Sequence, residues 1–352
     1  QDQKSAIGDI KKDLSVPHMM TRLLQGDVGS GKTVVALAAA VMAAGSRYQT
    51  AFMAPTELLA EQHLETALQW LKPMGILPIL VSHSNSSKKE IRSAVASGKI
   101  RGGIGTHALF QESLQFEKLG LVIVDEQHRF GVEQRGELMK KARDLVPHLL
   151  MMTATPIPRT LALTLYGDLD LTIIGQKPVG RLPVKTTILW DRERPRLYQK
   201  IRQVAERGGQ VYIIYPLIDT SEKLELKSAT QMYERFRKEV FPDLRMTLVH
   251  GRMKSDEKDL ILKEFKKQKY QILVSTTVIE VGIDVANATL MVIEHPERLG
   301  LSQLHQLRGR VGRGTAESEC VLVADRFLTE RLRVMERTED GFEIAEEDLR
   351  IR

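Results

Sequence analysis

Apolar residues follow two alternating patterns along the first half of this chain. Short continuous apolar runs, which are typical of buried strands, occur at 50–54, 76–81, 103–106, 121–124 and 149–152. Segments with apolar residues at helical spacing, some of them near prolines, occur at 1–15, 34–44, 56–71 and 87–96. Continuous apolar strands that alternate with helices indicate a parallel sheet with helices on both faces.

The second half repeats this alternation after an irregular stretch at 175–183, which contains two glycines and two prolines and is typical of a linker. Strands are expected at 184–189, 210–215, 246–249, 271–275, 290–293 and 320–323. Helices are expected at 195–207, 227–240, 255–267 and 303–307, the third with a capped start at Ser255. A chain of 352 residues exceeds what one core usually holds, so we expect two α/β domains, 1–178 and 184–352.

Composition indicates the general class of protein but does not indicate its function. Hydrophobic residues at 42% and charged residues at 27% are typical of a soluble globular chain, and no apolar run reaches membrane-spanning length. The first residues do not resemble a signal peptide, and the single cysteine, Cys320, excludes an internal disulfide framework and suits the cytosol. The formal charge of +6 is compatible with a nucleic-acid partner but does not require one. Trp70 and Trp190 are expected to be buried or half-buried rather than to stack on bases.

The stretch between the apolar pair 23–24 and the helix at 34–44 matches the pattern G-x-x-x-x-G-K-[ST]. Its glycines allow the backbone N–H groups to approach a phosphate chain closely, and the following helix N-terminus favours an anion. In this pattern the lysine reaches the β- and γ-phosphates and the threonine hydroxyl reaches Mg²⁺. The expected nucleotide-binding residues are Gly26, Asp27, Val28, Gly29, Ser30, Gly31, Lys32 and Thr33.

Two further clusters contain residue types that are suited to catalysis. Asp125 and Glu126 follow a buried strand, where one carboxylate can hold Mg²⁺ and the other can activate a water. His128, two residues further on, is equally compatible with a structural hydrogen bond. Near the end of the chain, Arg310 and Arg313 lie among glycines, which is compatible with arginine fingers or with a basic phosphate-binding loop.

Taken in order, these segments resemble the motif series of the superfamily-two helicases, whose two RecA-like domains close on ATP. The segments resembling motifs I, Ia, Ib, II and III are 26–33, 54–62, 105–107, 125–128 and 153–156. Those resembling motifs IV, V and VI are 249–253, 275–284 and 306–313.

Within this superfamily the chain is most similar to the RecG-type branched-DNA helicases, through segments 125–132, 155–162 and 294–305. Transcription-repair coupling translocases of the Mfd type share several of these segments and are the nearest alternative. Val281 and His128 favour the RecG type. The resemblance also implies that this chain lacks the family's N-terminal wedge domain. It further implies that the chain ends, at Arg352, inside the region of the translocation motif.

The resemblance implies a role for each matching residue. Asp125 and Thr33 would hold Mg²⁺, Glu126 would act as the base, and Arg310 and Arg313 would be the fingers. Gln3 would read the adenine, and Thr153 and Thr155 would couple the ATP state to the grip on DNA. The residues that would contact the DNA backbone are Thr106, Arg252, Thr276 and Thr277.

We therefore expect an ATP- and Mg²⁺-dependent motor that moves on double-stranded DNA and acts on branched DNA in repair and recombination. Its ATP would bind in the cleft between two RecA-like domains. It is expected to be a monomer of the bacterial cytoplasm with no membrane contact, and a single-strand-binding protein is a candidate partner. A regulatory nucleotide-binding module that performs no work, and an RNA helicase, are the alternatives.

Overall fold

The computed structural model describes residues 1–82, 89–111, 114–126, 146–154, 169–176, 182–216, 222–276, 285–324 and 330–351. The chain divides into two compact units, Gln1–Pro178 and Val179–Arg352, called unit 1 and unit 2 below. The division falls within the segment 175–183 that its glycines and prolines marked as a linker. Four residues of the sequence hypothesis lie outside the described residues, namely His128, Thr155, Thr277 and Val281.

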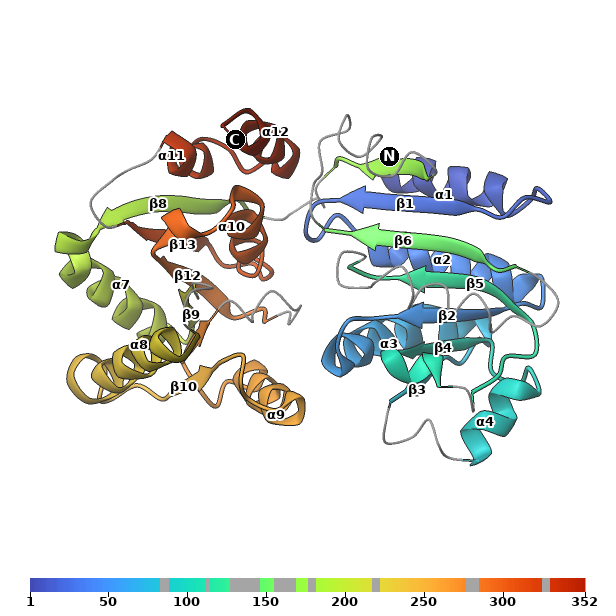
Figure 1. Ribbon diagram of the computed structural model, residues 1–352, viewed down its shortest axis with the longest axis horizontal. Coiled ribbons are helices and arrows are strands. Elements are labelled where there is room, and N and C mark those ends of the chain that lie inside the picture. The colour runs from blue at the N-terminus through green and yellow to red at the C-terminus, as the bar shows by residue number, and fades with distance from the viewer. Residues whose placement is uncertain are drawn as a thin grey trace. The chain divides into compact units, whose positions relative to one another are not determined.

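Unit 1 is built on a parallel sheet with the strand order β3-β4-β2-β5-β6-β1-β7 (Figure 1). The strands are β1 (Thr21–Gly26), β2 (Gln49–Met53), β3 (Ile79–Val81), β4 (Gly102–Gly105), β5 (Leu119–Val124), β6 (His148–Thr153) and β7 (Asp170–Ile174). The apolar runs predicted β2 to β6, and the apolar pair 23–24 before the phosphate loop lies in β1. They did not predict β7, because this strand lies at the edge of the sheet and its burial alternates along a short segment.

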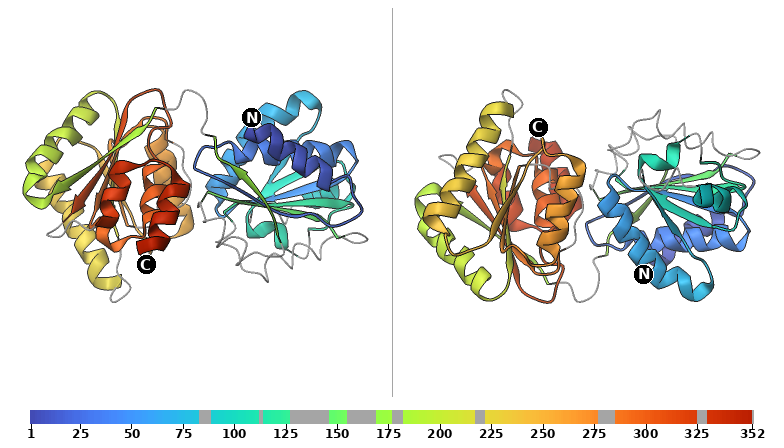
Figure 2. Two further views of the ribbon diagram at one scale, coloured as in Figure 1. Left: turned by 90° about the horizontal axis from the view of Figure 1, so that it is seen from above. Right: turned by 90° about the horizontal axis from the view of Figure 1, so that it is seen from below.

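Helices cover both faces of this sheet (Figure 2). They are α1 (Asp2–Asp13), α2 (Lys32–Gly45), α3 (Glu57–Leu71) and α4 (Lys89–Ala96), with short 3-10 turns η1 (Lys72–Met74) and η2 (His107–Phe110). In β5, Leu121 and Ile123 pack in the cluster formed with α1, α2 and α3. Val122 and Val124 pack in the opposite cluster, which includes residues of α4 and η2. The strand is therefore apolar at every position because both of its faces are buried.

Unit 2 repeats the architecture with a parallel sheet in the order β10-β11-β9-β12-β13-β8. The strands are β8 (Val184–Trp190), β9 (Gln210–Tyr215), β10 (Met246–Val249), β11 (Ile272–Thr276), β12 (Ala288–Glu294) and β13 (Ser318–Ala324). All six strands were expected, and Cys320 on β13 is fully buried. Burial raises the pKa of its thiol to about 12, which makes it unreactive.

The helices of unit 2 are α7 (Arg194–Glu206), α8 (Glu222–Arg235), α9 (Ser255–Lys266), α10 (Leu301–Arg308), α11 (Glu330–Arg337) and α12 (Gly341–Ile351). Single turns occur at η4 (Asp191–Glu193), η5 (Phe236–Val240) and η7 (Pro296–Arg298). Residues of α7 and η5 pack on one face of the sheet. On the other face, Phe265 of α9 stacks against Tyr212 of β9 with ring centroids 5.1 Å apart. The sequence patterns did not predict α11 and α12.

Two local expectations were wrong. Ser255 does not cap α9: the capping residue is Lys254, no side chain closes the first turn, and Ser255 is the first residue of the helix. Trp70 is 53% exposed rather than buried, because the buried stripe of α3 runs through Ala60, Ala67 and Leu71 and leaves Trp70 beside it. Trp190 is half-buried, as expected.

The same glutamine contact occurs at the same place in both units. Gln49, the first residue of β2, donates from Nε2 to the Val95 carbonyl at 2.9 Å and to the Ile100 carbonyl at 2.7 Å. Gln210, the first residue of β9, donates from Nε2 in the same way to the carbonyl of Phe265, in the last turn of α9, at 2.7 Å and to the carbonyl of Tyr270, after α9, at 2.8 Å. Since β2 and β9 hold the same place in their sheets, these two buried amides mark the units as structural repeats.

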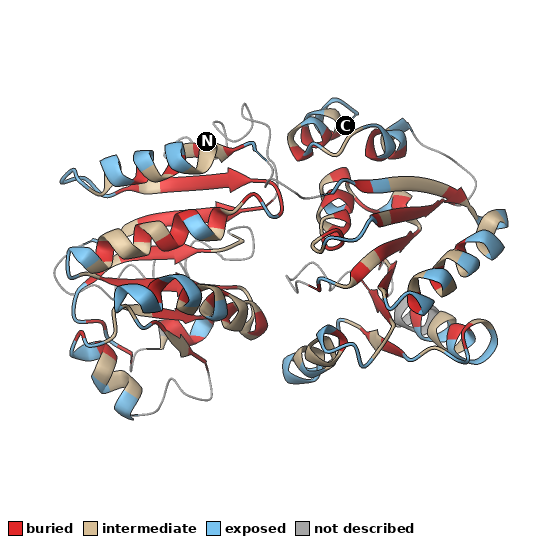
Figure 3. Cartoon of the chain, turned by 180° about the vertical axis from the view of Figure 1, so that it is seen from behind, coloured by how far each residue is buried: buried red, intermediate tan, exposed pale blue. Residues whose placement is uncertain are grey.

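Burial follows the layers of each unit. Most strands are almost wholly buried, whereas the helices bury one side and expose the other (Figure 3). Three strands at sheet edges, β3, β7 and β8, are only partly buried. In the part of the chain that the structure describes, no helix is long and apolar enough to cross a membrane.

Candidate active site

The loop between β1 and α2 has the backbone that a phosphate-binding loop requires. Gly29 and Gly31 have φ angles of +79° and +89°, in the left-handed region that favours glycine. Gly31 is the residue that caps α2, so the helix N-terminus opens directly onto the loop. A Cβ atom at Gly31 would lie 2.1 Å from the Gln3 amide nitrogen, which also explains why this position is glycine.

Lys32 is folded onto this loop. Its ammonium group donates to the carbonyls of Gly26 at 2.7 Å and Asp27 at 3.0 Å, and the residue is only 9% exposed. Burying an ammonium is costly unless it is hydrogen-bonded. The loop carbonyls meet that need and hold the lysine among the residues that the sequence assigned to phosphate binding.

Gln3 contacts the same loop from α1. Its Nε2 donates to the Ser30 carbonyl at 2.9 Å. The start of α1 is fixed in turn by Asp2, whose Oδ2 accepts from the backbone N–H groups of Gly175 and Gln176, each at 2.9 Å. The structure thus brings Gln3 from the start of the chain to the phosphate loop.

Asp125 follows β5 and reaches the same edge of the sheet. Its Oδ1 accepts from the Glu126 backbone N–H at 3.0 Å, and its Oδ2 lies 2.8 Å from Nε2 of His63. Burial opposes ionisation of Asp125, but the hydrogen bond and charge of His63 and the nearby charge of Lys32 outweigh it and lower its pKa. Asp125 is therefore an ionised carboxylate in the neighbourhood of Lys32.

Glu126 has a backbone conformation that is rare outside glycine, with φ at +51°. Such a residue costs about 1–3 kcal/mol and is found mainly at functional sites. Its Oε2 accepts from the backbone N–H of Ala154 at 3.5 Å. This contact joins the acidic pair after β5 to the segment after β6, so two of the predicted motifs lie together.

These residues fit a Mg²⁺ ion that is shared with a nucleotide. The described residues contain no group of three or more His, Cys, Asp and Glu side chains that could hold a metal alone. Mg²⁺ at phosphate sites is commonly held by one or two protein oxygens together with substrate phosphates and water. An ionised Asp125 and the hydroxyl of Thr33 on the first turn of α2 supply such oxygens.

The two finger candidates of unit 2 differ in exposure. Arg310 is 6% exposed, whereas Arg313 is half-buried and donates from Nε to the Gly309 carbonyl at 3.2 Å. Both guanidinium charges lie near the buried hydroxyl of Tyr212, whose pKa is raised by burial and lowered in part by these two charges. Arg313 is thus the more accessible of the two.

The predicted DNA-contact residues Thr106, Arg252 and Thr276 and the predicted coupling residue Thr153 also differ in exposure. Arg252 is exposed, whereas Thr106, Thr153 and Thr276 are each at most 6% exposed. These three threonines end or follow strands β4, β6 and β11 respectively. Of the described candidates, Arg252 is therefore the one with an accessible side chain.

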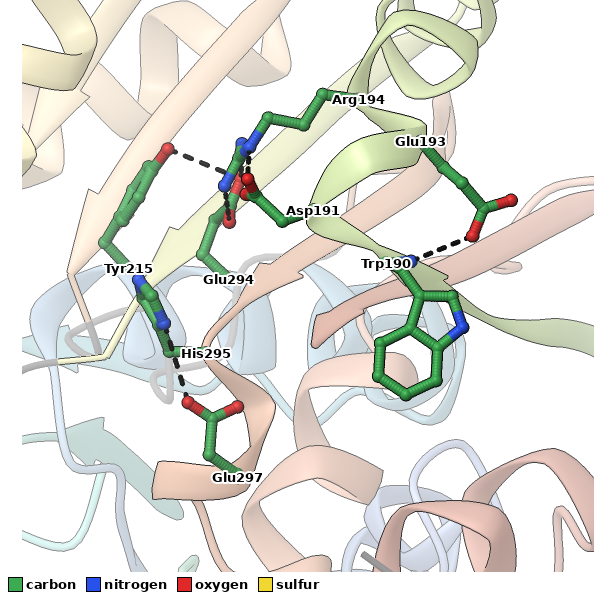
Figure 4. A network of polar contacts seen from close by, with 8 residues as sticks. All are labelled: Trp190, Asp191, Glu193, Arg194, Tyr215, Glu294, His295 and Glu297. Carbon is green, nitrogen blue, oxygen red and sulfur yellow. Dashed lines mark hydrogen bonds and ion pairs between the residues drawn. The ribbon is translucent and has the colours of Figure 1, made fainter. Parts of the chain in front are cut away.

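A buried ion pair at the carboxyl edge of the unit 2 sheet was not expected from the sequence (Figure 4). Arg194 donates to both carboxylate oxygens of Glu294 at 2.9 Å, and Tyr215 donates to Oε1 at 3.4 Å. The Glu294 side chain is 1% exposed, and the hydrogen bond and charge of this carboxylate outweigh burial and raise the pKa of Arg194. The pair joins the start of α7 to the ends of β9 and β12.

Arg308 was also missed, although it lies within the segment that contains both finger candidates. It is 3% exposed, and one nitrogen donates to the carbonyls of Met335 and Thr338 at 2.9 and 3.0 Å and to the Thr186 hydroxyl at 3.1 Å. Arg308 therefore attaches the end of α11 to α10 and β8.

Known protein families match both units. The DEAD/DEAH box helicase family matches residues 1–164, and the helicase conserved C-terminal domain family matches residues 195–315. Three curated relatives, each described as ATP-dependent DNA helicase RecG, come from Synechocystis sp., Aquifex aeolicus and Escherichia coli (strain K12). They are 50%, 52% and 48% identical to this chain over 100%, 99% and 99% of its length. Over its whole length the chain is therefore similar to RecG helicases. It spans about half the length of these RecG relatives, namely 43%, 45% and 52%.

Solved structures agree with the RecG assignment. A structure of RecG bound to a three-way DNA junction matches the whole chain with a TM-score of 0.87 and 47% identity, and the match covers 46% of that RecG chain. Dbp5 of S. cerevisiae, solved with RNA and ADP BeF3, matches 98% of this chain and 88% of its own with a TM-score of 0.69. At 16% identity, Dbp5 shows that the fold is shared and no more.

One residue that the motifs missed still had a signal in the sequence. His63 lies on the buried stripe of α3, four residues before Ala67 and three after Ala60. A polar side chain on such a stripe must find a hydrogen-bond partner. That rule indicates that His63 has a partner, but only the fold identifies the partner as Asp125, 62 residues away.

Proposed function

We propose that this chain is the ATP-driven motor of a RecG-type DNA helicase. It binds ATP and Mg²⁺ at the carboxyl edge of the unit 1 sheet, hydrolyses the ATP and moves along double-stranded DNA. Its substrates are branched DNAs, such as stalled forks and Holliday junctions, in repair and recombination. The motor acts as a monomer in the bacterial cytoplasm, with a single-strand-binding protein as a partner.

The observation that carries this proposal is the meeting of separate segments at one edge of unit 1. Lys32 and Gln3 contact the phosphate loop, the Lys32 charge acts on Asp125, and Glu126 contacts the segment after β6. When bound, Mg²⁺ neutralises charge that develops on the phosphates. Lys32 binds the β- and γ-phosphates, Asp125 and Thr33 hold the metal, and Glu126 accepts a proton from the attacking water.

The roles in unit 2 follow from exposure and charge. We assign the finger role first to Arg313, because it is more accessible than Arg310. Arg252 contacts DNA phosphates. The buried threonines Thr106, Thr153 and Thr276 act indirectly, by positioning the ends of strands β4, β6 and β11. The RecG relative bound to a three-way junction supports branched DNA as the substrate. Contacts to phosphates should make binding independent of sequence and sensitive to salt.

The test is the rate of ATP hydrolysis measured with no DNA, linear duplex, single strand, branched DNA and single-stranded RNA. We expect stimulation by DNA, strongest with the branched form. A rate that does not respond to any nucleic acid favours the regulatory nucleotide-binding module instead. Stimulation by RNA above DNA favours an RNA helicase.

The site assignment is tested by Lys32→Ala, which removes the ammonium group from the phosphate loop. Hydrolysis should then fall to background in every condition. Lys72→Ala is the matched control, since Lys72 is an exposed lysine of η1, directly after the last residue of α3. Undiminished hydrolysis by the Lys32 variant would place the chemistry elsewhere.

A further inference from the structure

One contact to the metal-binding carboxylate comes from a residue that no motif includes. Nε2 of His63 lies 2.8 Å from Oδ2 of Asp125, and both side chains are largely buried, with 11% and 14% exposure. His63 comes from the middle of α3, and Asp125 follows β5. We propose that His63 is a positioning residue, which orients the Asp125 carboxylate for Mg²⁺ and so sets the affinity for metal-bound nucleotide. This inference rests on the proposed function, because it needs Asp125 to be the metal carboxylate.

The direction of the hydrogen bond follows from the charge of Asp125. Its pKa is lowered, so the carboxylate is ionised at neutral pH and can only accept. The hydrogen must therefore be on Nε2 of His63. The other oxygen of Asp125 already accepts from the Glu126 backbone N–H at 3.0 Å. One donor on each oxygen prevents rotation of the carboxyl group and leaves its remaining lone pairs in fixed directions.

Both partners of this hydrogen bond are held in place. Its ring stacks on Phe52 of β2, with ring centroids 4.6 Å apart and an angle of 32° between the planes. Phe52 is 2% exposed, so the imidazole rests on a fixed surface of the core. The backbone of Asp125 is fixed too, since its N–H donates to the Met53 carbonyl at 2.9 Å. Both ends of the His63–Asp125 hydrogen bond are therefore anchored on the same strand, β2.

The expected size of the effect follows from the chemistry of metal sites. Hydrogen-bond partners of metal ligands fix ligand orientation, and their loss typically costs 10–100-fold in metal affinity or activity. A carboxylate without its second donor could rotate out of the metal-binding orientation. The alternative is a purely structural role, in which His63 only fills space against Phe52. The two roles depend on different atoms of the imidazole, so they can be separated.

Two substitutions divide these roles. His63→Gln keeps an N–H donor at a similar distance from the backbone but removes the ring that stacks on Phe52. His63→Phe keeps an aromatic ring against Phe52 but has no donor for Asp125. His148→Gln is the matched control: His148 is a half-buried histidine at the start of β6, and its Nδ1 accepts from the Met20 backbone N–H at 3.0 Å.

The measurement is the binding of a fluorescent ATP analogue to the full chain as Mg²⁺ is titrated, with a parallel titration in a chelator. We expect His63→Phe to need about 10–100-fold more Mg²⁺ for half-maximal binding. His63→Gln and His148→Gln should stay close to wild type, and binding in the chelator should be the same in all four proteins. Hydrolysis rates at limiting and saturating Mg²⁺ should follow the same order.

The opposite order, with His63→Phe like wild type and His63→Gln impaired, overturns the proposal in favour of packing. An equal loss in both variants, or in neither, also overturns it. If His63→Phe lowers the melting temperature, His63→Met replaces it as a variant that fills the space without a donor. If wild-type protein shows no Mg²⁺-dependent nucleotide binding at all, the proposed function itself is refuted. That result differs from a failure of the His63 proposal, in which the wild-type protein still binds.

Discussion

The ion pair between Arg194 and Glu294 offers the sharpest test of how unit 2 is held together. Arg194→Met keeps the length of the side chain and removes the guanidinium group. Among the described residues, the Glu294 carboxylate, 1% exposed, would then keep only the Tyr215 hydroxyl at 3.4 Å. Removing one partner of a buried ion pair typically costs about 3–5 kcal/mol, because the other charge stays buried without compensation. The lost contact of Arg194 with Asp191 adds little, since that carboxylate is 63% exposed.

A loss of this size is easily measured. It corresponds to roughly a hundredfold to several-thousandfold decrease in the ratio of folded to unfolded unit 2. At about 2–4 °C per kcal/mol for a domain of this size, the melting temperature should fall by about 6–20 °C. Trp190 ends β8, directly before Asp191, and Trp70 is the only other tryptophan. In a Trp70→Phe background, the fluorescence of Trp190 therefore reports the unfolding of unit 2 alone.

Two comparisons decide whether the reasoning is right. Arg196→Met makes the same substitution on the same helix, but Arg196 is 71% exposed and 3.9 Å from its carboxylate, so the change should be within about 1 kcal/mol. Adding Glu294→Gln to Arg194→Met removes the unpaired charge and should restore most of the lost stability. The account is refuted if Arg194→Met costs no more than Arg196→Met, or if the double variant is no more stable than Arg194→Met.

Three further predictions concern both units. Glu126→Gln should bind ATP as wild type does but fail to hydrolyse it, which equilibrium binding and single-turnover hydrolysis would check together; loss of binding would contradict the role of base. Arg313→Ala should lower the hydrolysis rate roughly a thousandfold or more while the fold is kept, and a small change would return this arginine to a surface role. Gln49→Leu should destabilise unit 1 and Gln210→Leu unit 2, each by roughly 1–3 kcal/mol for every polar group left without a partner, as followed by the tryptophan of each unit. Equal destabilisation of both units by either change would argue against two separate repeats.

The sequence predicted most of the strands and the order of the motifs because these depend on local patterns. A strand buried on both faces must be apolar at every position, and a phosphate loop must have glycines where φ is positive, as at Gly29 and Gly31. Such requirements act within a few residues, so they can be read directly along the chain. Edge strand β7 was not predicted because one side of it is only half-buried. Ser255 and Trp70 show that the type of a single residue does not decide whether it caps a helix or is buried.

Partners that lie far apart in the chain were decided only by the tertiary structure. His63 with Asp125, Arg194 with Glu294 and Arg308 with the end of α11 join residues 62, 100 and 27 positions apart. Histidine, arginine and glutamate satisfy their charge or hydrogen bonds with many partners, so composition and spacing do not select one. The parallel sheets select it, because they bring the carboxyl ends of separate strands to one edge, where a buried polar group must find its partner.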